Sequence, residues 1–249
     1  MSTATTVSGR VYLVGAGPGD PELLTLKAAR LLGRADVVLH DRLVGAGVLE
    51  HCRPGAELIF VGKRRAEHHM RQAEIHALMI DRARAGLLVV RLKGGDPLIF
   101  GRGGEEIESL ALAGIPVEVV PGVTAAAGCA AQSLIPLTHR DLAQTLILVS
   151  GHSQDGEPAL DWQALCRPRQ TLVFYMGHAV LDRLTARLIG HGLASDLAAC
   201  LILNGTLPTA RRITGTLATL PELVRGAEPL DGPALLVVGD VVDRARGPA

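Results

Sequence analysis

Short apolar runs alternate with helical patterns along almost the whole chain, and this alternation constrains the fold more than any other feature. In the first half, the runs that predict β-strands are Val11–Val14, Val37–His40, Leu58–Val61, Leu87–Leu92 and Val117–Val120. Amphipathic stretches that predict helices lie between several of them: Leu23–Leu32, Gln72–Ala85 and Glu105–Ala113. An alternating order of strand and helix is typical of a mostly parallel sheet covered by helices.

The alternation restarts after Pro121. A helix is predicted at Thr124–Gln132, and five strands follow it: Thr145–Ser150, Thr171–Tyr175, Ala198–Leu203, Arg211–Gly215 and Ala234–Gly239. We therefore expect an α/β protein with mostly parallel or mixed sheets. The length allows one large domain or two compact ones that share a cleft, and the restart of the pattern favours a division into residues 1–121 and 122–249. The polar segment Ser153–Pro158 contains glycine and proline, and it is predicted to form a surface loop.

Local signals mark the ends of several predicted helices. Asp20 can cap the first helix and Pro21 can occupy its first position. Thr219 and Glu222 have the spacing of a capping box, which predicts a helix start near the end of the chain. Glycines that can end helices in the left-handed region follow three predicted helices: Gly33, Gly86 and Gly114.

The composition excludes several classes of partner. Lys plus Arg and Asp plus Glu both number 25, so no net charge attracts polyanions. One tryptophan, two tyrosines and three phenylalanines leave few rings on which bases could stack. No apolar run reaches the roughly 18–20 residues of a membrane helix, and the first residues lack the regions of a signal peptide. We expect a cytoplasmic protein that binds neither nucleic acid nor membranes.

The four cysteines are far apart in the sequence and form no CxxC pair. They are Cys52, Cys129, Cys166 and Cys200. A zinc site or a disulfide framework would need closer spacing or an oxidising compartment. We therefore predict free thiols that fill the core, and no metal site.

Polar and glycine-rich segments follow the predicted strands of the first half. They are Gly15–Asp20, His40–Arg42, Gly62–Arg64, Lys93–Pro97 and Pro121–Thr124. In open α/β sheets, functional groups lie at the carboxyl ends of the strands. Each segment alone is a plausible turn, but five of them together indicate one lined crevice. This pattern disfavours a protein that only binds or scaffolds other proteins.

The first of these segments is similar to a dinucleotide-binding loop but departs from it. A GxGxxG pattern needs its third glycine where Asp20 stands, and Pro18 removes a backbone N–H that would face phosphate. A carboxylate at the helix start would also compete with a pyrophosphate. Since no GxxxxGK[ST] loop occurs either, a nicotinamide-dependent oxidoreductase and an ATP-binding protein are both disfavoured.

Two later segments carry candidate ligand-binding groups. In Lys93–Pro97, two glycines let a ligand approach the backbone, and Asp96 can accept hydrogen bonds from an amine or a hydroxyl. A plain β-turn before a helix is the alternative. In Phe100–Glu106, Arg102 suits a bidentate grip on a substrate carboxylate, with a solvated arginine as the alternative.

Eight motifs occur in order between residues 9 and 243. They are VGAGPGDPELLTLKA (14–28), GKR (62–64), VVRLKGGDPLIFGRGGEE (89–106), VPGVTAAAGCAA (120–131), IPLTHRD (135–141), TLVFYMG (171–177), NGT (204–206) and GPALLVVG (232–239). This set resembles the uroporphyrinogen-III C-methyltransferases, which are class III S-adenosylmethionine-dependent enzymes of the tetrapyrrole methylase family. The resemblance implies a homodimer that binds S-adenosylmethionine in the cleft between its two α/β domains. The implied reaction methylates uroporphyrinogen III at C2 and C7, giving precorrin-1 and then precorrin-2 for cobalamin- or sirohaem-type biosynthesis.

The resemblance also assigns functional positions. It implies cofactor contacts at Pro18, Gly94, Gly95, Asp96, Ile99, Thr124, Ala125, Met176 and Gly205. It implies that Asp41 accepts a proton and that Lys63 donates one. Because the substrate is a polycarboxylate, we expect a locally basic cleft within this neutral chain. The candidate substrate contacts are Arg102, His139 and Arg140, with Glu105 able to bond pyrrole N–H groups.

These residue types suit the implied chemistry. A pyrrole carbon attacks the sulfonium methyl in line, so most of the enzyme's work is alignment. A carboxylate such as Asp41 can stabilise the positive charge that passes to the tetrapyrrole, or accept a proton. Without the resemblance, Asp41 would be interpreted as a helix cap or as a salt-bridge partner of Arg42. Some proposals for the family assign the proton-abstracting role to the arginine at the position of Arg102. A guanidinium keeps its proton at neutral pH, so we favour Arg102 as an anchor and leave the base role open.

The chain departs from the family at three positions. His76 stands where the family often has asparagine, and Gln132 and Leu134 stand where it often has a tyrosine-glycine type of pair. None of the three is a cofactor position, so they bear on the substrate more than on methyl transfer. A methylase of the same superfamily that acts on a later corrin intermediate, or on protein or RNA, remains an alternative.

Overall fold

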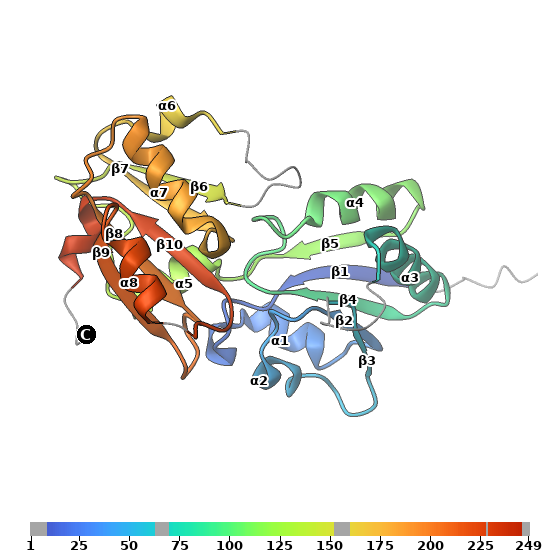
Figure 1. Ribbon diagram of the computed structural model, residues 1–249. Coiled ribbons are helices and arrows are strands. Elements are labelled where there is room, and N and C mark those ends of the chain that lie inside the picture. Colours follow the sequence, from blue (N-terminus) through green and yellow to red (C-terminus); the bar gives the residue numbers. More distant parts are fainter. Residues whose placement is uncertain (1–8, 63–69, 152–159, 228, 246–249) are drawn as a thin grey trace, which may run out of the picture. The chain divides into compact units, whose positions relative to one another are not determined.

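The chain folds into two compact units, Met1–Thr124 and Ala125–Ala249, each built around its own five-stranded sheet (Figure 1). The computed structural model describes residues 9–62, 70–151, 160–227 and 229–245. The predicted α/β class with parallel or mixed sheets is confirmed. Lys63 and the loop predicted at Ser153–Pro158 lie outside the described residues.

The first unit contains a parallel sheet with the strand order β3-β2-β4-β1-β5. Its strands are β1 Arg10–Gly15, β2 Val37–His40, β3 Glu57–Phe60, β4 Leu88–Lys93 and β5 Val117–Val120. Because every pairing is parallel, all five strands end at the same edge. The glycine-rich and polar segments that follow these strands are therefore brought to one edge by the topology alone.

Helices cover both faces of this sheet (Figure 1). They are η1 Pro21–Leu23, α1 Leu26–Leu32, α2 Ala46–Leu49, α3 Gln72–Arg84 and α4 Gly103–Leu112. On one face, Leu32 of α1 packs in the same buried cluster as Val38 of β2. On the other face, Met79 of α3 and Leu110 of α4 pack with Leu13 of β1. Burial of each such side chain contributes about 1.5–3 kcal/mol, which fixes which face each helix covers.

The second unit contains a mixed sheet with the order β6-β7-β10-β8-β9. Its strands are β6 Thr145–Ser150, β7 Gln170–Tyr175, β8 Ala198–Leu203, β9 Arg211–Thr216 and β10 Ala234–Val238. Its helices are α5 Ala125–Gln132, α6 Trp162–Leu165, η2 His178–Val180, α7 Leu181–Gly190, α8 Leu220–Gly226 and η3 Asp240–Arg244. Because β10 is antiparallel to both β7 and β8, these two strands run in the same direction and end at the same edge.

The first predicted helix is divided in two. Asp20 caps only the short η1 turn, where its carboxylate accepts the N–H of Glu22 at 2.9 Å. Thr25 then caps α1 by accepting the N–H of Ala28 at 3.1 Å. Gly33 ends α1 with φ −66°, so the predicted left-handed conformation is wrong there. The stretch contains two N-cap residues, Asp20 and Thr25, and a separate helical segment begins after each of them.

Later helix ends follow the predictions in part. Gly86 and Gly114 have φ of +83° and +70°, as expected for glycines that end helices. The helix start predicted at Thr219 is confirmed, because α8 begins at Leu220, but the capping-box hydrogen bond is absent. The Thr219 hydroxyl instead accepts the N–H of Thr216 at 2.9 Å. The threonine side chain therefore closes the turn that leaves β9, which removes it as a cap for α8.

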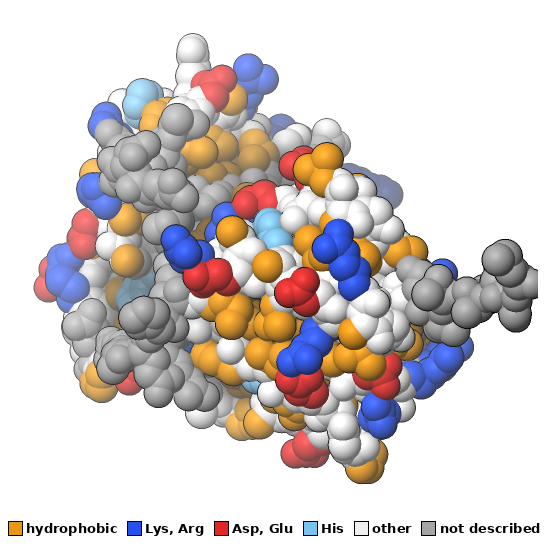
Figure 2. Space-filling view, turned by 90° about the vertical axis from the view of Figure 1, so that its right-hand side faces the viewer, with side chains coloured by type: hydrophobic (Ala, Val, Ile, Leu, Met, Phe, Trp, Pro, Cys, Tyr) orange, Lys and Arg blue, Asp and Glu red, His pale blue; other side chains and the backbone are white. Residues whose placement is uncertain are grey.

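The surface and the thiols agree with a neutral chain that has an ordinary core. All four cysteines are free, and two of them, Cys129 and Cys200, are buried. Acidic and basic side chains are interspersed on the face that Figure 2 shows. Among the described residues, no helix combines the length and the apolar character needed to cross a bilayer.

Candidate active site

The carboxyl edge of the first sheet brings three glycine-containing turns into contact. Gly17 and Gly95 exchange backbone hydrogen bonds of 3.2 and 2.7 Å, which join the turns after β1 and β4. A Cβ on Gly122, in the turn after β5, would lie 2.3 Å from the carbonyl oxygen of Gly95. A Cβ on Gly15 would lie 2.5 Å from the backbone nitrogen of Gly122. These positions need glycine because backbone meets backbone there, and the result is a surface lined by main chain.

We expect Gly122→Ala to destabilise the protein by about 1–3 kcal/mol, because the new methyl group overlaps a carbonyl that cannot move without displacing β4. Gly104→Ala is the matched control: its Cβ would meet no atom within 4 Å, and in α4 it should stabilise by about 0.5–1 kcal/mol. Denaturant unfolding followed by circular dichroism measures both changes. Equal midpoints for the two variants would contradict the close approach.

Asp96 connects two of these turns. One carboxylate oxygen accepts the N–H of Leu98 at 2.9 Å, and the other accepts the N–H of Gly122 at 3.1 Å. The carboxylate for which we predict hydrogen bonds from a ligand amine or hydroxyl thus already accepts two main-chain N–H groups, although each oxygen keeps acceptor capacity. Asp96 holds the shape of the turn in which Gly94 and Gly95 lie, and these two glycines remain half-buried at the edge.

The other cofactor positions predicted in the first unit lie at the same edge. Pro18 follows β1 and is half-buried. Ile99 is also half-buried, and its N–H contacts the carbonyl of Asp96 at 3.4 Å. Thr124 follows β5 and is the last residue of the unit. The structure therefore brings the ends of β1, β4 and β5 together, as the parallel topology requires.

Asp41 follows β2 at this edge and is one-quarter exposed. Its Oδ1 accepts the N–H of Leu43 at 3.0 Å, which closes a local turn. Its Oδ2 lies 3.7 Å from a guanidinium nitrogen of Arg91, in β4. Among the described residues, the ion-pair partner of Asp41 is therefore Arg91, rather than the neighbouring Arg42. Asp41 has one oxygen fixed by backbone and one turned toward a buried cation.

Behind Asp41 lies a buried charge cluster that the sequence patterns did not point to: Arg91, Lys93 and Glu106. Oε1 of Glu106, in α4, accepts hydrogen bonds from Arg91 Nε and Lys93 Nζ, both at 3.0 Å. Burial lowers the pKa of Lys93, the nearby Arg91 lowers it further, and Glu106 opposes both effects. One signal was available, since two cations stand two residues apart in a strand that is otherwise apolar.

Arg102 and Glu105, both predicted to contact substrate, bind each other. Nε and a terminal nitrogen of Arg102 donate to the two oxygens of Glu105 at 2.8 and 2.6 Å. This bidentate hydrogen bond lowers the pKa of the exposed Glu105 carboxyl. Arg102 also precedes α4 with φ +59°, a left-handed conformation that is unfavourable for a side-chain-bearing residue. A substrate carboxylate would have to compete with Glu105 for this guanidinium.

In the second unit, Met176 follows β7 and Gly205 follows β8, so both lie at one edge of the second sheet. Met176 is about half exposed, with φ +55°. Gly205 is buried against α5, where a Cβ would lie 2.3 Å from Sγ of Cys129. Burial raises the pKa of Cys129 to about 11, so this thiol is a packing group and not a nucleophile. Ala125 begins α5, whose next N–H donates to the hydroxyl of Tyr175 at 3.0 Å.

His139 and Arg140 lie elsewhere in the second unit. Nδ1 of His139 accepts the N–H of Asp141 at 3.2 Å, and the carbonyl of Arg140 accepts from Arg169 at 3.0 Å. Arg169 precedes β7 directly, so this turn lies at the amino edge of the sheet. β7 has six residues and separates the two edges by roughly 20 Å. Within this unit, the structure does not bring His139 and Arg140 together with Met176.

Backbone strain gathers near the predicted positions. The described non-glycine residues with positive φ are Phe100, Arg102, Leu134, Arg169, Met176, Asn204 and Thr206. Each costs about 1–3 kcal/mol, and such residues cluster at functional sites. Arg102 and Met176 are themselves predicted contacts, while Asn204 and Thr206 flank Gly205. Four of the seven residues thus lie at or beside predicted functional positions, whereas Arg169 lies at the amino edge of the second sheet.

The three departures from the family have distinct local roles. Gln132 accepts the N–H of Thr206 at 2.6 Å, so it ties the end of α5 to the turn that contains Gly205. Leu134 has φ +54°, a conformation in which the family's glycine would be unstrained. His76 lies 3.0 Å from Gln72, which in turn reaches Glu106, and burial lowers the His76 pKa. The first two departures lie at the end of α5 and in the turn after it, and the third borders the buried charge cluster.

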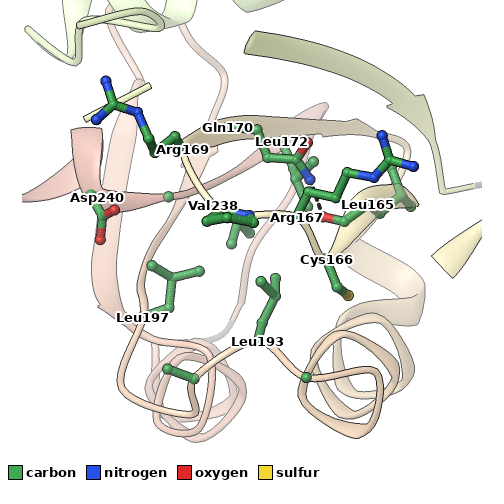
Figure 3. A pocket seen from close by; sticks show the side chains of 14 residues that line it. Leu165, Cys166, Arg167, Arg169, Gln170, Leu172, Leu193, Leu197, Val238 and Asp240 are labelled. Atoms are coloured by element: carbon green, nitrogen blue, oxygen red, sulfur yellow. Dashed lines mark hydrogen bonds between the residues drawn. The ribbon is translucent and has the colours of Figure 1, made fainter. Parts of the chain in front are cut away.

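A pocket of about 370 Å³ lies within the second unit but away from these positions (Figure 3). Leu193, Leu197 and Val238 lie around the same space, with Arg169 and Asp240 among the other lining residues. These side chains surround the start of β7 and the end of β10, which is the edge opposite Met176. The pocket therefore holds none of the predicted cofactor positions.

Comparison with known proteins gives a family match. The family model of the tetrapyrrole (corrin/porphyrin) methylases matches residues 10–221. The sirohaem synthase of Pseudomonas fluorescens Pf0-1 is 57% identical over 239 residues, which are 96% of this chain and 51% of that protein. The sirohaem synthase of Pseudomonas putida W619 is 58% identical over 94% of this chain and 50% of its own length. The chain thus spans about half the length of these curated relatives.

Solved structures agree. The uroporphyrin-III C-methyltransferase of Thermus thermophilus, in complex with S-adenosylhomocysteine, is 46% identical with a TM-score of 0.81. That match covers 95% of this chain and 100% of the other. A cobalt precorrin-4 methyltransferase has a TM-score of 0.84 at 29% identity, over 98% of this chain and 99% of the other. Similarity in sequence is therefore greater to the uroporphyrin-III enzyme, although both share the fold.

Proposed function

We propose that this chain, which belongs to the tetrapyrrole (corrin/porphyrin) methylases, transfers methyl groups from S-adenosylmethionine to C2 and C7 of uroporphyrinogen III. The products are precorrin-1 and then precorrin-2, as in cobalamin- or sirohaem-type biosynthesis. The observation that carries the proposal is the 46% identity to a uroporphyrin-III C-methyltransferase across 95% of the chain. The homodimer and the cytoplasmic location stay predictions from the sequence.

The predicted cofactor positions fit S-adenosylmethionine. In the first unit they offer half-buried main chain at Gly94 and Gly95 and apolar surface at Ile99. In the second they offer the half-exposed thioether of Met176. No cationic side chain is among the nine predicted positions, and Asp96 is an anion. This donor set suits a ligand with a positively charged sulfonium and polar groups that bond to backbone.

When bound, S-adenosylmethionine supplies an electrophilic methyl group, and the residues of the chain position the reactants and handle the proton. Transfer of the methyl group to a pyrrole carbon gives the tetrapyrrole a positive charge. The tetrapyrrole becomes neutral again when it loses a proton. Asp41 is assigned as the acceptor because, among the described residues, its Oδ2 faces an ion-pair partner at 3.7 Å and accepts no hydrogen bond. Lys63 is assigned as the proton donor from the sequence resemblance alone.

Substrate anchoring is assigned to Arg102, with Glu105 exchanging its arginine partner for pyrrole N–H groups when substrate binds. The bidentate Arg102–Glu105 pair is exposed, so a substrate carboxylate can replace Glu105 with little desolvation. His139 and Arg140 are left outside the proposed site, because they lie at the other edge of their sheet from Met176.

Anaerobic incubation with uroporphyrinogen III and methyl-labelled S-adenosylmethionine tests the proposal. We expect a tetrapyrrole that carries two labelled methyl groups, detected by mass spectrometry. We also expect S-adenosylhomocysteine to bind and to compete with the methyl donor in calorimetry. Label transferred only to a later corrin intermediate would replace the substrate and keep the reaction class. Absence of both label transfer and S-adenosylhomocysteine binding would refute the methylase.

A further inference from the structure

The three buried charges of the first unit have no evident role in stability. Arg91, Lys93 and Glu106 are 5, 4 and 0% exposed. A strand in a parallel sheet that is covered on both faces normally carries aliphatic side chains at such positions. Replacement of a buried ion cluster by apolar groups of similar volume is often neutral or stabilising. A cluster that gives little stability in the place of apolar packing calls for another explanation.

The topology places this cluster directly beside Asp41. Arg91 pairs in register with Leu39 of β2, and Asp41 stands two residues beyond Leu39. Side chains two apart on a strand point to the same face, so Lys93 follows Arg91 onto the face covered by α3 and α4. Glu106 comes from the first turn of α4, which covers that face. All these groups belong to one unit.

The guanidinium of Arg91 is held on two sides before it meets Asp41. One terminal nitrogen donates to the carbonyls of Leu39 and Leu92 at 3.4 and 3.1 Å. Nε donates to Glu106 at 3.0 Å. The remaining terminal nitrogen is the one that lies 3.7 Å from Asp41. Because the guanidinium is planar and rigid, fixing two nitrogens also fixes the direction of the third.

Glu106 makes an asymmetric set of contacts. Its Oε1 accepts from Arg91 and Lys93 and also from Nε2 of Gln72 at 3.3 Å. Its Oε2 is buried and has no hydrogen-bond partner among the described residues. An unsatisfied buried oxygen costs about 1–3 kcal/mol, so this carboxylate is not arranged for stability. The charges still balance, since two carboxylates, Asp41 and Glu106, face two cations.

We propose that Glu106 and Lys93 are positioning residues for methyl transfer: Glu106 fixes the guanidinium of Arg91, Arg91 holds the Asp41 carboxylate at the end of β2, and Lys93 balances the second negative charge. This proposal deepens the proposed function and rests on it. Glu106 acts only through Arg91 and does not contact the reactants. The free-energy cost of burying the three charges is thereby offset by a functional gain, since the Asp41 carboxylate has a fixed direction.

The double variant Lys93→Met/Glu106→Gln tests the proposal, because it removes one charge of each sign and keeps the side-chain volumes similar. We expect kcat to fall about 10–100-fold, as expected when a reacting group is misplaced by about 1 Å. The KM for S-adenosylmethionine and the affinity for S-adenosylhomocysteine should change less than about twofold. Glu57→Gln is the matched control, since it breaks an ion pair between Glu57 and Arg82 of α3 in the same unit and should leave kcat unchanged.

Two further measurements separate positioning from a general structural effect. In an Asp41→Asn background, the double substitution should cause no further loss of kcat, whereas multiplied losses would overturn the proposal. A crystal structure of the double variant should show the Arg91 guanidinium out of ion-pair range of residue 41; an unchanged distance would also overturn it. The crystallographic result does not depend on the substrate. A wild-type protein that leaves uroporphyrinogen III unmethylated would therefore count against the proposed function alone.

Discussion

Asp41→Asn is expected to lower kcat by about 10²–10⁴-fold while S-adenosylhomocysteine still binds with nearly wild-type affinity. Asparagine has the same shape, and its carbonyl oxygen can still accept the N–H of Leu43, so the turn after β2 is kept. The substitution removes the negative charge that faces Arg91 and the oxygen that is proposed to accept the substrate proton. Steady-state transfer of labelled methyl groups measures kcat, and calorimetry measures the affinity.

Asp36→Asn is the control, because Asp36 stands at the other end of the same strand. Its two oxygens bind Arg53 at 2.7 Å and the N–H of Leu88 at 2.8 Å, far from the carboxyl edge. This variant should lose some stability and keep its kcat. An unchanged kcat in Asp41→Asn, or equal losses in the two variants, would return Asp41 to the role of a turn residue.

Most strands were predictable because they are largely apolar runs that end at a glycine, a proline or a polar residue. Val37–His40, Val117–Val120 and Ala198–Leu203 begin and end as predicted. The common edge of the first unit also followed from the sequence, since parallel strands must all end on one side. The contact between the turns at Gly95 and Gly122 is a consequence of this shared edge.

The direction of β6 in the second unit was not predictable from the sequence. This direction determines where His139 and Arg140 lie, because they precede β6 in the chain. In a mixed sheet, neighbouring strands can run either way, and no local pattern states which. β6 runs parallel to β7, so the residues before β6 lie beside the start of β7, at Arg169. Their basic character made them reasonable substrate contacts, but the strand direction takes them to the opposite edge from Met176.

The charge cluster depends on a long-range contact that no local pattern contains. Arg91 and Lys93 form a charge cluster only because α4 places Glu106 over β4. In the sequence, Glu106 stands beside Glu105 and is indistinguishable from an exposed helical glutamate. The two have opposite environments, since Glu105 pairs with Arg102 at the surface while Glu106 is fully buried. A turn of about 100° per residue along α4 separates these roles.

Glu106→Gln alone is expected to destabilise the protein by about 3–5 kcal/mol at pH 7, because it leaves two buried cations without their anion. Urea unfolding measures the loss. Adding Lys93→Met should restore part of it, since one of the uncompensated charges is then removed. A loss below about 1 kcal/mol for the single variant, or a further loss in the double variant, would show that Glu106 does not balance these cations.

The stability of the Glu106→Gln variant should depend on pH in a defined direction. Burial lowers the pKa of Lys93 in the folded state, and Glu106 opposes that effect, so Glu106→Gln should lower the pKa further. Between the folded-state pKa and the ordinary value of 10.5, the unfolded chain binds more protons than the folded one, and stability therefore rises with pH. The deficit of Glu106→Gln should shrink as the pH rises from 7 toward 10, because neutral Lys93 no longer repels Arg91. A deficit that stays constant over this range would mean that Lys93 keeps its proton, and that the lost anion acts on Arg91 alone.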